Sequence, residues 1–176
     1  MAEKVRAVRE RAETYGRDIR FGLRVHVIAR DTAEEAWAEA DRLLAGIDES
    51  DIARVQEGLK RSESEGQKRM LALNGGTKDG LEIHPGLWAG VGLVRGGAGT
   101  ALIGSHHQVA DLIEEYASVG IEEFVLSGYP HLEEAYAFGE GVLPELARRG
   151  RWVHPSPPPL FGSAVPFGSS LKVAVS

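Results

Sequence analysis

Arg24 and His26 are the first residues whose types and spacing suggest chemistry. They stand two apart in the short apolar run 21–29. Because side chains alternate across a strand, this spacing places both on one face, while the apolar residues beside them point to the other. A buried guanidinium is costly unless it is paired. Two interpretations follow: a carboxylate inside the sheet holds Arg24, or the two cations line an anion-binding site.

A further cation, Arg95, stands in the glycine-rich stretch 87–99. Glycine is conformationally free and costs entropy to order, so we expect this loop to be mobile without a ligand. A mobile loop with one arginine suits a lid that excludes water and carries charge to an anion, with Gly96 and Gly97 beside the ligand. A plain surface turn is the alternative. The stretch lacks Gly-Lys-Ser/Thr and precedes a strand, which excludes a P-loop.

Tyr129 and His131 follow the predicted strand 121–127 and stand where a helix begins. Parallel α/β proteins bind ligands outside the carboxyl ends of their strands, so Tyr129 would be presented to a ligand. His131 would lie at the helix N-terminus, where the dipole disfavours its protonation. The alternative is that these are turn residues that only cap the helix.

Arg24, His26, Arg95, Tyr129 and His131 together predict a cationic, hydrogen-bonding pocket without a carboxylate or a nucleophile. Such a pocket binds an oxyanion but does little chemistry alone, which points to a cofactor that carries the reaction.

We predict no metal site. The chain has no cysteine, and the adjacent His106 and His107 have no partner at metal-ligand spacing. His106 and His107 are more simply explained as residues at a helix start, and His84 and His154 support no site.

The elements that must position these residues alternate along the chain. We predict helices over 2–17, from Asp31 or Thr32 to about Leu44, around 49–60 and 65–73, over 106–119 and from His131 to about Leu146, and strands over 21–29, 100–104 and 121–127, with a possible fourth in 87–94. This alternation predicts an α/β fold with a parallel sheet. Three or four strands are fewer than a doubly wound sheet or a TIM barrel needs.

Residues 1–150 are expected to form the folded unit, with an insertion over about 46–86 and the lid loop over about 87–99. The insertion is polar and short of large apolar residues, so we expect a solvated helical excursion. Residues 151–176 carry five of the eight prolines among serine and glycine, which predicts an extended arm.

Composition excludes several classes of protein. The 176 residues are 43% hydrophobic, which excludes a mostly disordered chain, and the absence of cysteine excludes a disulfide scaffold. The net charge of −6 gives no electrostatic footprint for nucleic acid. No apolar run approaches the ~18 residues of a membrane span. No apolar signal segment follows Met1, so we expect a cytoplasmic protein.

Three motifs in this order resemble the FMNH2-dependent alkanesulfonate monooxygenases of the bacterial-luciferase-like flavin family. They are FGLRVHVI over 21–28, LWAGVGLVRGGAGTAL over 87–102 and FVLSGYPHLEEA over 124–135. The resemblance implies a TIM (β/α)8 barrel, of which residues 1–150 would be the carboxyl-terminal half. Family members are about twice as long, so we expect no activity from this half without the amino-terminal half.

The resemblance also implies a reaction and its partners. A separate NAD(P)H-dependent FMN reductase would supply reduced FMN, and O2 would be used to cleave an alkanesulfonate to an aldehyde and sulfite. Arg24, His26 and Tyr129 would line the sulfonate and flavin pocket, Arg95 would lie on the lid, and His131 would face the pocket. We expect a homo-oligomer or pairing with the missing barrel half.

Two other functions stay open. A non-catalytic anion-binding or interaction module, left from a truncated gene, would keep the pocket and assemble through its sheet edges. A luciferase-like monooxygenase for another substrate would keep the flavin chemistry. Arg24 and Arg95 argue against an uncharged substrate, because two unneutralised cations in a dry pocket are costly.

Overall fold

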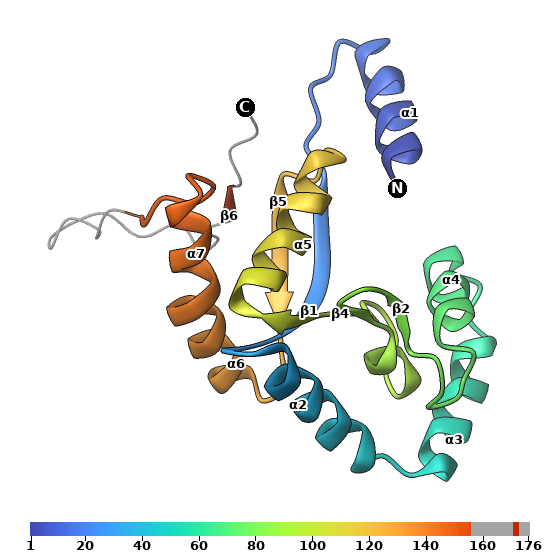
Figure 1. The fold of residues 1–176 in the computed structure, drawn as a ribbon. Coiled ribbons are helices and arrows are strands. Elements are labelled where there is room, and N and C mark those ends of the chain that lie inside the picture. Colours follow the sequence, from blue (N-terminus) through green and yellow to red (C-terminus); the bar gives the residue numbers. More distant parts are fainter. Residues whose placement is uncertain (156–170, 173–176) are drawn as a thin grey trace, which may run out of the picture.

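A six-stranded mixed sheet forms the centre of the computed structural model, which describes residues 1–155 and 171–172 (Figure 1). The strand order is β2-β3-β4-β1-β5-β6. The strands are β1 (Gly22–Arg30), β2 (Glu82–His84), β3 (Leu87–Trp88), β4 (Ala101–Ser105), β5 (Glu123–Ser127) and β6 (Leu171–Lys172). The α/β class and the three predicted strands are thus confirmed.

The sheet is parallel only at its centre, where β1 pairs with β4 on one side and β5 on the other. β2, β3 and β6 pair antiparallel, so the prediction of a wholly parallel sheet is wrong at both edges. At the β2–β3 edge the reason is the turn at Pro85-Gly86, since so short a connection permits only an antiparallel pair.

β1 lies between β4 and β5, so these two consecutive strands do not pair with each other. Residues Gly22 to His26 of β1 pair with β5, and residues His26 to Arg30 pair with β4. This order differs from that of a (β/α)8 barrel, in which consecutive strands are neighbours. The long central strand thereby gives both shorter strands a hydrogen-bonding partner.

The predicted helices are present, with some changed ends. They are α1 (Ala2–Glu13), α2 (Ala33–Ala45), α3 (Glu49–Lys60), α4 (Glu65–Asn74), α5 (His106–Ser118), α6 (His131–Ala137) and α7 (Leu143–Arg148). Thr32 and Ser105 cap α2 and α5 in reciprocal capping boxes with Glu35 and Gln108. A π-helical turn at Phe138–Val142 joins α6 to α7, and a short 3-10 helix at Gly90–Leu93 lies in the predicted lid loop.

The two faces of β1 are covered differently. Val25, Val27 and Ala29 pack into a core with α5, which crosses β1 and β5 in Figure 1, and with the segment that includes α7. On the other face, Ile28 packs with α2 and with residues of the predicted insertion. That cover ends before the first residues of β1, where Arg24 is exposed.

The predicted insertion is helical and most of its side chains are exposed, as expected, but the segment also contributes to the core. Ile52 and Leu81 are buried in the second core beside Trp88, and β2 joins the sheet. The segment has few apolar residues, and some of these, such as Leu73, stay exposed. Of the predicted arm over 151–176, residues 156–170 and 173–176 lie outside the described residues.

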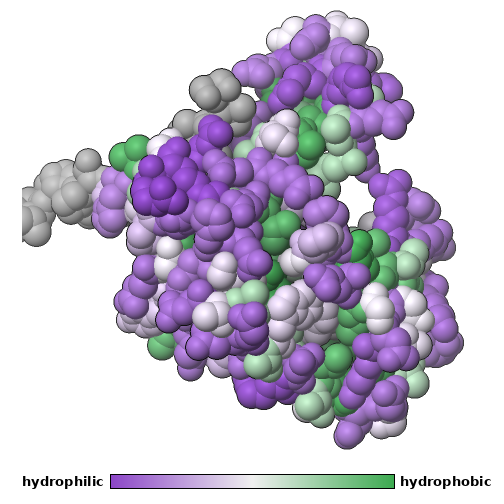
Figure 2. All heavy atoms as spheres, viewed as in Figure 1, coloured by the Kyte–Doolittle hydropathy of each residue, from purple (hydrophilic) through white to green (hydrophobic). Residues whose placement is uncertain are grey.

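Hydrophilic side chains cover most of the surface seen in Figure 2, with hydrophobic ones grouped between the elements. Within the described residues, no helix combines the length and the apolar character needed to cross a membrane.

The capping box of α5 gives a stability prediction. Ser105→Ala removes the acceptor of the Gln108 N–H, which lies 3.2 Å from Ser105 Oγ, and should lower the unfolding free energy by about 1 kcal/mol. Ser118→Ala, at the opposite end of the same helix, is the control, because its hydroxyl bonds the Glu115 carbonyl at an exposed site. Urea denaturation measures both; equal effects would contradict the role of the cap.

Candidate functional site

His26 lies at the centre of the residues predicted to form the site. It is 1% exposed, and its register partner on β5 is Ser127, whose Oγ lies 3.2 Å from His26 Nδ1. Its ring stacks on that of Tyr129, with centroids 5.3 Å apart. The other nitrogen, Nε2, is buried and has no hydrogen-bond partner among residues 1–155. A buried polar atom left in this state points to a group that the site is built to receive.

Tyr129 joins the remaining predicted residues to His26. The His131 ring lies 5.0 Å from the Tyr129 ring. The Arg95 guanidinium lies 5.8 Å from the Tyr129 ring centroid and donates a hydrogen bond to the Tyr129 hydroxyl. Four residues from three distant parts of the chain are thus brought together; we call them, with Arg24, the cationic cluster.

Arg24 shares a face with His26, as the alternation predicted, because both are in register with β5 at positions two apart. Its side chain is exposed, and it makes no hydrogen bond or ion pair with any residue that the structure describes. The interpretation that a carboxylate inside the sheet holds Arg24 is therefore wrong for this part of the chain. Its guanidinium is available to an external anion.

The surroundings keep His26 neutral. Burial lowers the pKa of His26, because the charged ring is poorly solvated, and Arg95 lowers it further. Arg24 and His131 act in the same direction, while a backbone interaction with Ala98 partly opposes them. The leading electrostatic effects on the ring come from Arg95, Arg24 and His131, and each of them opposes protonation.

The position of the cluster differs in part from the expectation. Tyr129 and His131 follow the carboxyl end of β5, as predicted. Arg24 and His26 instead lie in the first five residues of β1, which is the half of the strand that pairs with β5. The site therefore forms where β5 ends against the middle of β1.

Gly96 and Gly97 face the inserted helices. The Gly97 N–H donates to Gln67 Oε1 at 3.1 Å, and Gly96 packs tightly on Gln67 and Leu59. They shape the loop that carries Arg95, and their contact with a ligand stays a prediction. Sequence reasoning missed Gln67 and a second buried amide, Gln56, which follows the buried Ile52 by one helical turn.

Sequence reasoning also missed an ion pair beneath the site. Glu134 is 1% exposed, and its Oε1 lies 2.6 Å from Arg30 Nη2, which raises the pKa of Arg30. A Cβ at Gly128 would lie only 2.4 Å from Glu134 Cβ, so only glycine allows this approach. The pair joins the end of β1 to the helix that begins at His131. In the sequence, the signal for Glu134 was its spacing of one helical turn from His131.

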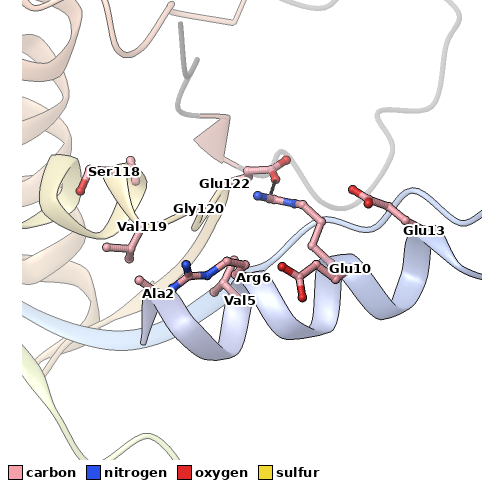
Figure 3. Close-up of a pocket in the computed structure, with 11 residues that line it drawn as sticks. Ala2, Val5, Arg6, Glu10, Glu13, Ser118, Val119, Gly120 and Glu122 are labelled. Carbon is pink, nitrogen blue, oxygen red and sulfur yellow. Dashed lines mark hydrogen bonds and ion pairs between the residues drawn. The ribbon is translucent and has the colours of Figure 1, made fainter.

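A pocket of about 360 Å³ includes His131 of the cationic cluster and the adjacent Ser127, but it also lies against Phe124 and Leu126, on the opposite face of β5. A larger pocket of about 710 Å³ lies between α1 and the end of α5 (Figure 3). Charged α1 residues such as Arg6, Glu10 and Glu13 line it, and no predicted site residue does.

Within residues 1–155 and 171–172, no group of three or more His, Asp or Glu side chains could hold a metal ion. His107 instead belongs to an ion network on the outer face, where its Nδ1 lies 3.0 Å from Glu145 Oε1 and hydrogen bonds to arginines lower the pKa of Glu145 to about 2.

The electrostatics of the cationic cluster predict a measurable shift in the pKa of His26 when Arg95 is replaced. Arg95→Ala should raise the pKa of His26, because it removes a cation that opposes protonation. Titration of the histidine ring signals by NMR measures this. Arg54→Ala is the control, since Arg54 pairs with Asp51 on α3 and does not act on His26. An unchanged pKa in Arg95→Ala would contradict the placement of Arg95.

The same shift fixes the sign of a stability effect. A histidine whose folded-state pKa is lowered binds its proton more readily in the unfolded chain. The stability that depends on neutral His26 is therefore complete above the ordinary histidine pKa and is lost as the pH falls toward the folded-state pKa. Arg95→Ala should make this loss smaller.

Comparison with known families identifies the family of the chain. The family model of luciferase-like monooxygenases matches residues 1–123 of the 176. The match spans Arg24, His26 and Arg95 and ends before Tyr129 and His131. This family has a TIM-barrel fold and generally uses reduced flavin. The chain shares parallel strands and the α/β class with such a barrel, although the order β4-β1-β5 differs from the order in a barrel. The chain belongs to the luciferase-like monooxygenase family.

Proposed function

We propose that this chain is the carboxyl-terminal part of an FMNH2-dependent monooxygenase that converts alkanesulfonates to aldehydes and sulfite. The observation that carries the proposal is the cationic cluster itself. Arg24 and Arg95 both act on the buried His26, and among the described residues its Nε2 has no hydrogen-bond partner. A sulfonate is a strong-acid anion with three oxygens, so it stays charged and can bind several donors at once.

The exposed Arg24 suits the first contact with the sulfonate. A guanidinium offers parallel N–H donors to two oxygens, which fixes the orientation of the anion as well as its charge. Arg95 would approach the same group from the loop side, where it already bonds the Tyr129 hydroxyl. The two arginines would thereby hold the carbon–sulfur bond in a defined position.

His26, Tyr129 and His131 are the residues that would face the flavin. The unpartnered Nε2 of His26 and the part-exposed ring of Tyr129 fit a planar, hydrogen-bonding group. When bound, reduced FMN supplies two electrons to O2, so that one oxygen atom enters the aldehyde and the other leaves as water. The lowered pKa of His26 keeps its ring neutral for hydrogen bonding.

The cations would also favour the bond-breaking step. As the carbon–sulfur bond breaks, the group leaves as sulfite, and its charge changes from −1 toward −2. Fixed positive groups aimed at a developing negative charge stabilise the transition state more than the ground state. Arg24 and Arg95 would therefore contribute to turnover as well as to binding.

Exposed apolar side chains on one side of the sheet support the proposal that the site is incomplete in this chain. Val125, beside Arg24 on this face, is 59% exposed, and Leu132 and Tyr136 on α6 are also largely exposed. We propose that the amino-terminal half of the barrel covers this face, with assembly into a homo-oligomer. A separate NAD(P)H-dependent reductase would supply the reduced FMN, and the setting would be cytoplasmic.

Substitutions of Arg24 test the proposal in the assembled enzyme. Arg24→Ala should lower kcat/KM for an alkanesulfonate by ~10²-fold, the usual effect of removing one donor from a developing charge. Arg24→Lys should restore only part of this, because an ammonium cannot bind two oxygens in the same geometry. Sulfite release measures turnover.

Arg42→Ala is the matched control, since Arg42 is exposed on α2 and pairs with Glu39. Normal turnover in Arg24→Ala would contradict the sulfonate site. Full activity in Arg24→Lys would show that charge alone matters at this position.

A further inference from the structure

The two ends of the loop that carries Arg95 are hydrogen-bonded to each other, and the inserted helices contact the loop on one side. Gly92 N–H donates to Gly99 O at 2.9 Å, which joins its two ends. We call residues 92–99 the Arg95 loop. The Arg95 side chain reaches Tyr129, 34 residues further along the chain, and the backbone at Ala98 lies near His26. The position of this loop decides whether Arg95 acts on the cluster.

Gln56 of α3 holds the first end of the Arg95 loop. It is 5% exposed, and its Nε2 donates to the carbonyls of Gly92 and Leu93 at 3.0 and 2.8 Å. Both amide hydrogens are thus used on the loop backbone. These hydrogen bonds go to backbone carbonyls and not to loop side chains, so they fix the path of the loop backbone.

Gln67 of α4 holds the tip of the loop next to Arg95. It is 9% exposed, and its Oε1 accepts the Gly97 N–H at 3.1 Å. Its own Nε2 is buried without a partner. Asn74, at the end of α4, fills the space beside Gly92, where a Cβ would lie 2.7 Å from its Nδ2, and that nitrogen also has no partner.

We propose that Gln56 and Gln67 are positioning residues that clamp the Arg95 loop over Tyr129. The inserted helices would thereby control the delivery of the Arg95 charge to the site. Within the described residues, two donors beside the loop, Gln67 Nε2 and Asn74 Nδ2, have no hydrogen-bond partner. The catalytic meaning of the clamp rests on the proposed function; the clamp itself does not.

Limited trypsin digestion of the full chain tests the clamp, because trypsin cuts after Arg95 only when the loop leaves its seat. Cleavage after Arg17, in the exposed segment between α1 and β1, is the internal reference. Gln67→Met keeps the length of the side chain but removes the acceptor. We expect it to increase cleavage after Arg95 about three- to tenfold relative to Arg17, as for opening with one hydrogen bond fewer.

Two variants make the result specific. Gln67→Glu keeps the acceptor oxygen and replaces only the unpartnered nitrogen, so cleavage after Arg95 should stay near the unmodified rate. Ala72→Met changes the exposed face of the same helix and should have no effect. General unfolding would accelerate cleavage after Arg95 and after Arg17 together, so the ratio of the two rates would stay the same.

The pKa of His26, measured by NMR, gives a second readout. In Gln67→Met it should rise toward the value found for Arg95→Ala, because a released loop carries its cation away. Unchanged cleavage and pKa in Gln67→Met, or equal acceleration in Gln67→Glu, would overturn the proposal. Neither substrate nor flavin enters this experiment, so its failure is distinguishable from failure of the proposed activity, which the Arg24 variants test.

Discussion

Burying an imidazole beside guanidinium groups disfavours the protonated ring, and the site depends on this constraint. His26 cannot gain a proton without placing another cation near Arg95 and Arg24, so it stays neutral while the arginines stay charged. The excess positive charge is compensated only by an anion from outside the cluster. The neutral state of His26 follows from this arrangement, and the proposed ligand class rests on it.

The fold produces the arrangement through the uneven cover of β1. Beyond His26, the second face of the strand is closed by α2 and the inserted segment, and Ile28 is buried there. Before His26 the same face is open, and Arg24 reaches solvent. His26 stands at the boundary, where it is buried by Tyr129 and the Arg95 loop. The Arg30–Glu134 ion pair then fixes the helix that presents His131 to the same strand.

Local chemistry explains what could be predicted from the sequence. Alternation along a strand was enough to place Arg24 and His26 on one face, and the helix predicted over 106–119 is found as α5 over His106–Ser118. These features depend on residues a few positions apart. Tyr129 could be placed near the site because it follows the carboxyl end of a strand.

Contacts across long sequence separations could not be read in this way. The central position of β1, the pairing of Arg30 with Glu134, and the bonds from Gln56 and Gln67 to the Arg95 loop join distant segments. A polar segment with few large apolar residues reads as solvated, although its buried amides bind backbone groups. For the same reason, the sequence did not show that Arg24 makes no hydrogen bond or ion pair with a described residue; only the structure around it shows this.

The most direct measurement of the central claim is a titration of the chain with a short alkanesulfonate, followed through the His26 ring by NMR. We predict saturable changes at His26 and a rise in its pKa, because a bound anion offsets the arginine charges. The alcohol with the same carbon chain should cause neither change. No saturable response to the sulfonate, or an equal response to the alcohol, would contradict an oxyanion site at His26.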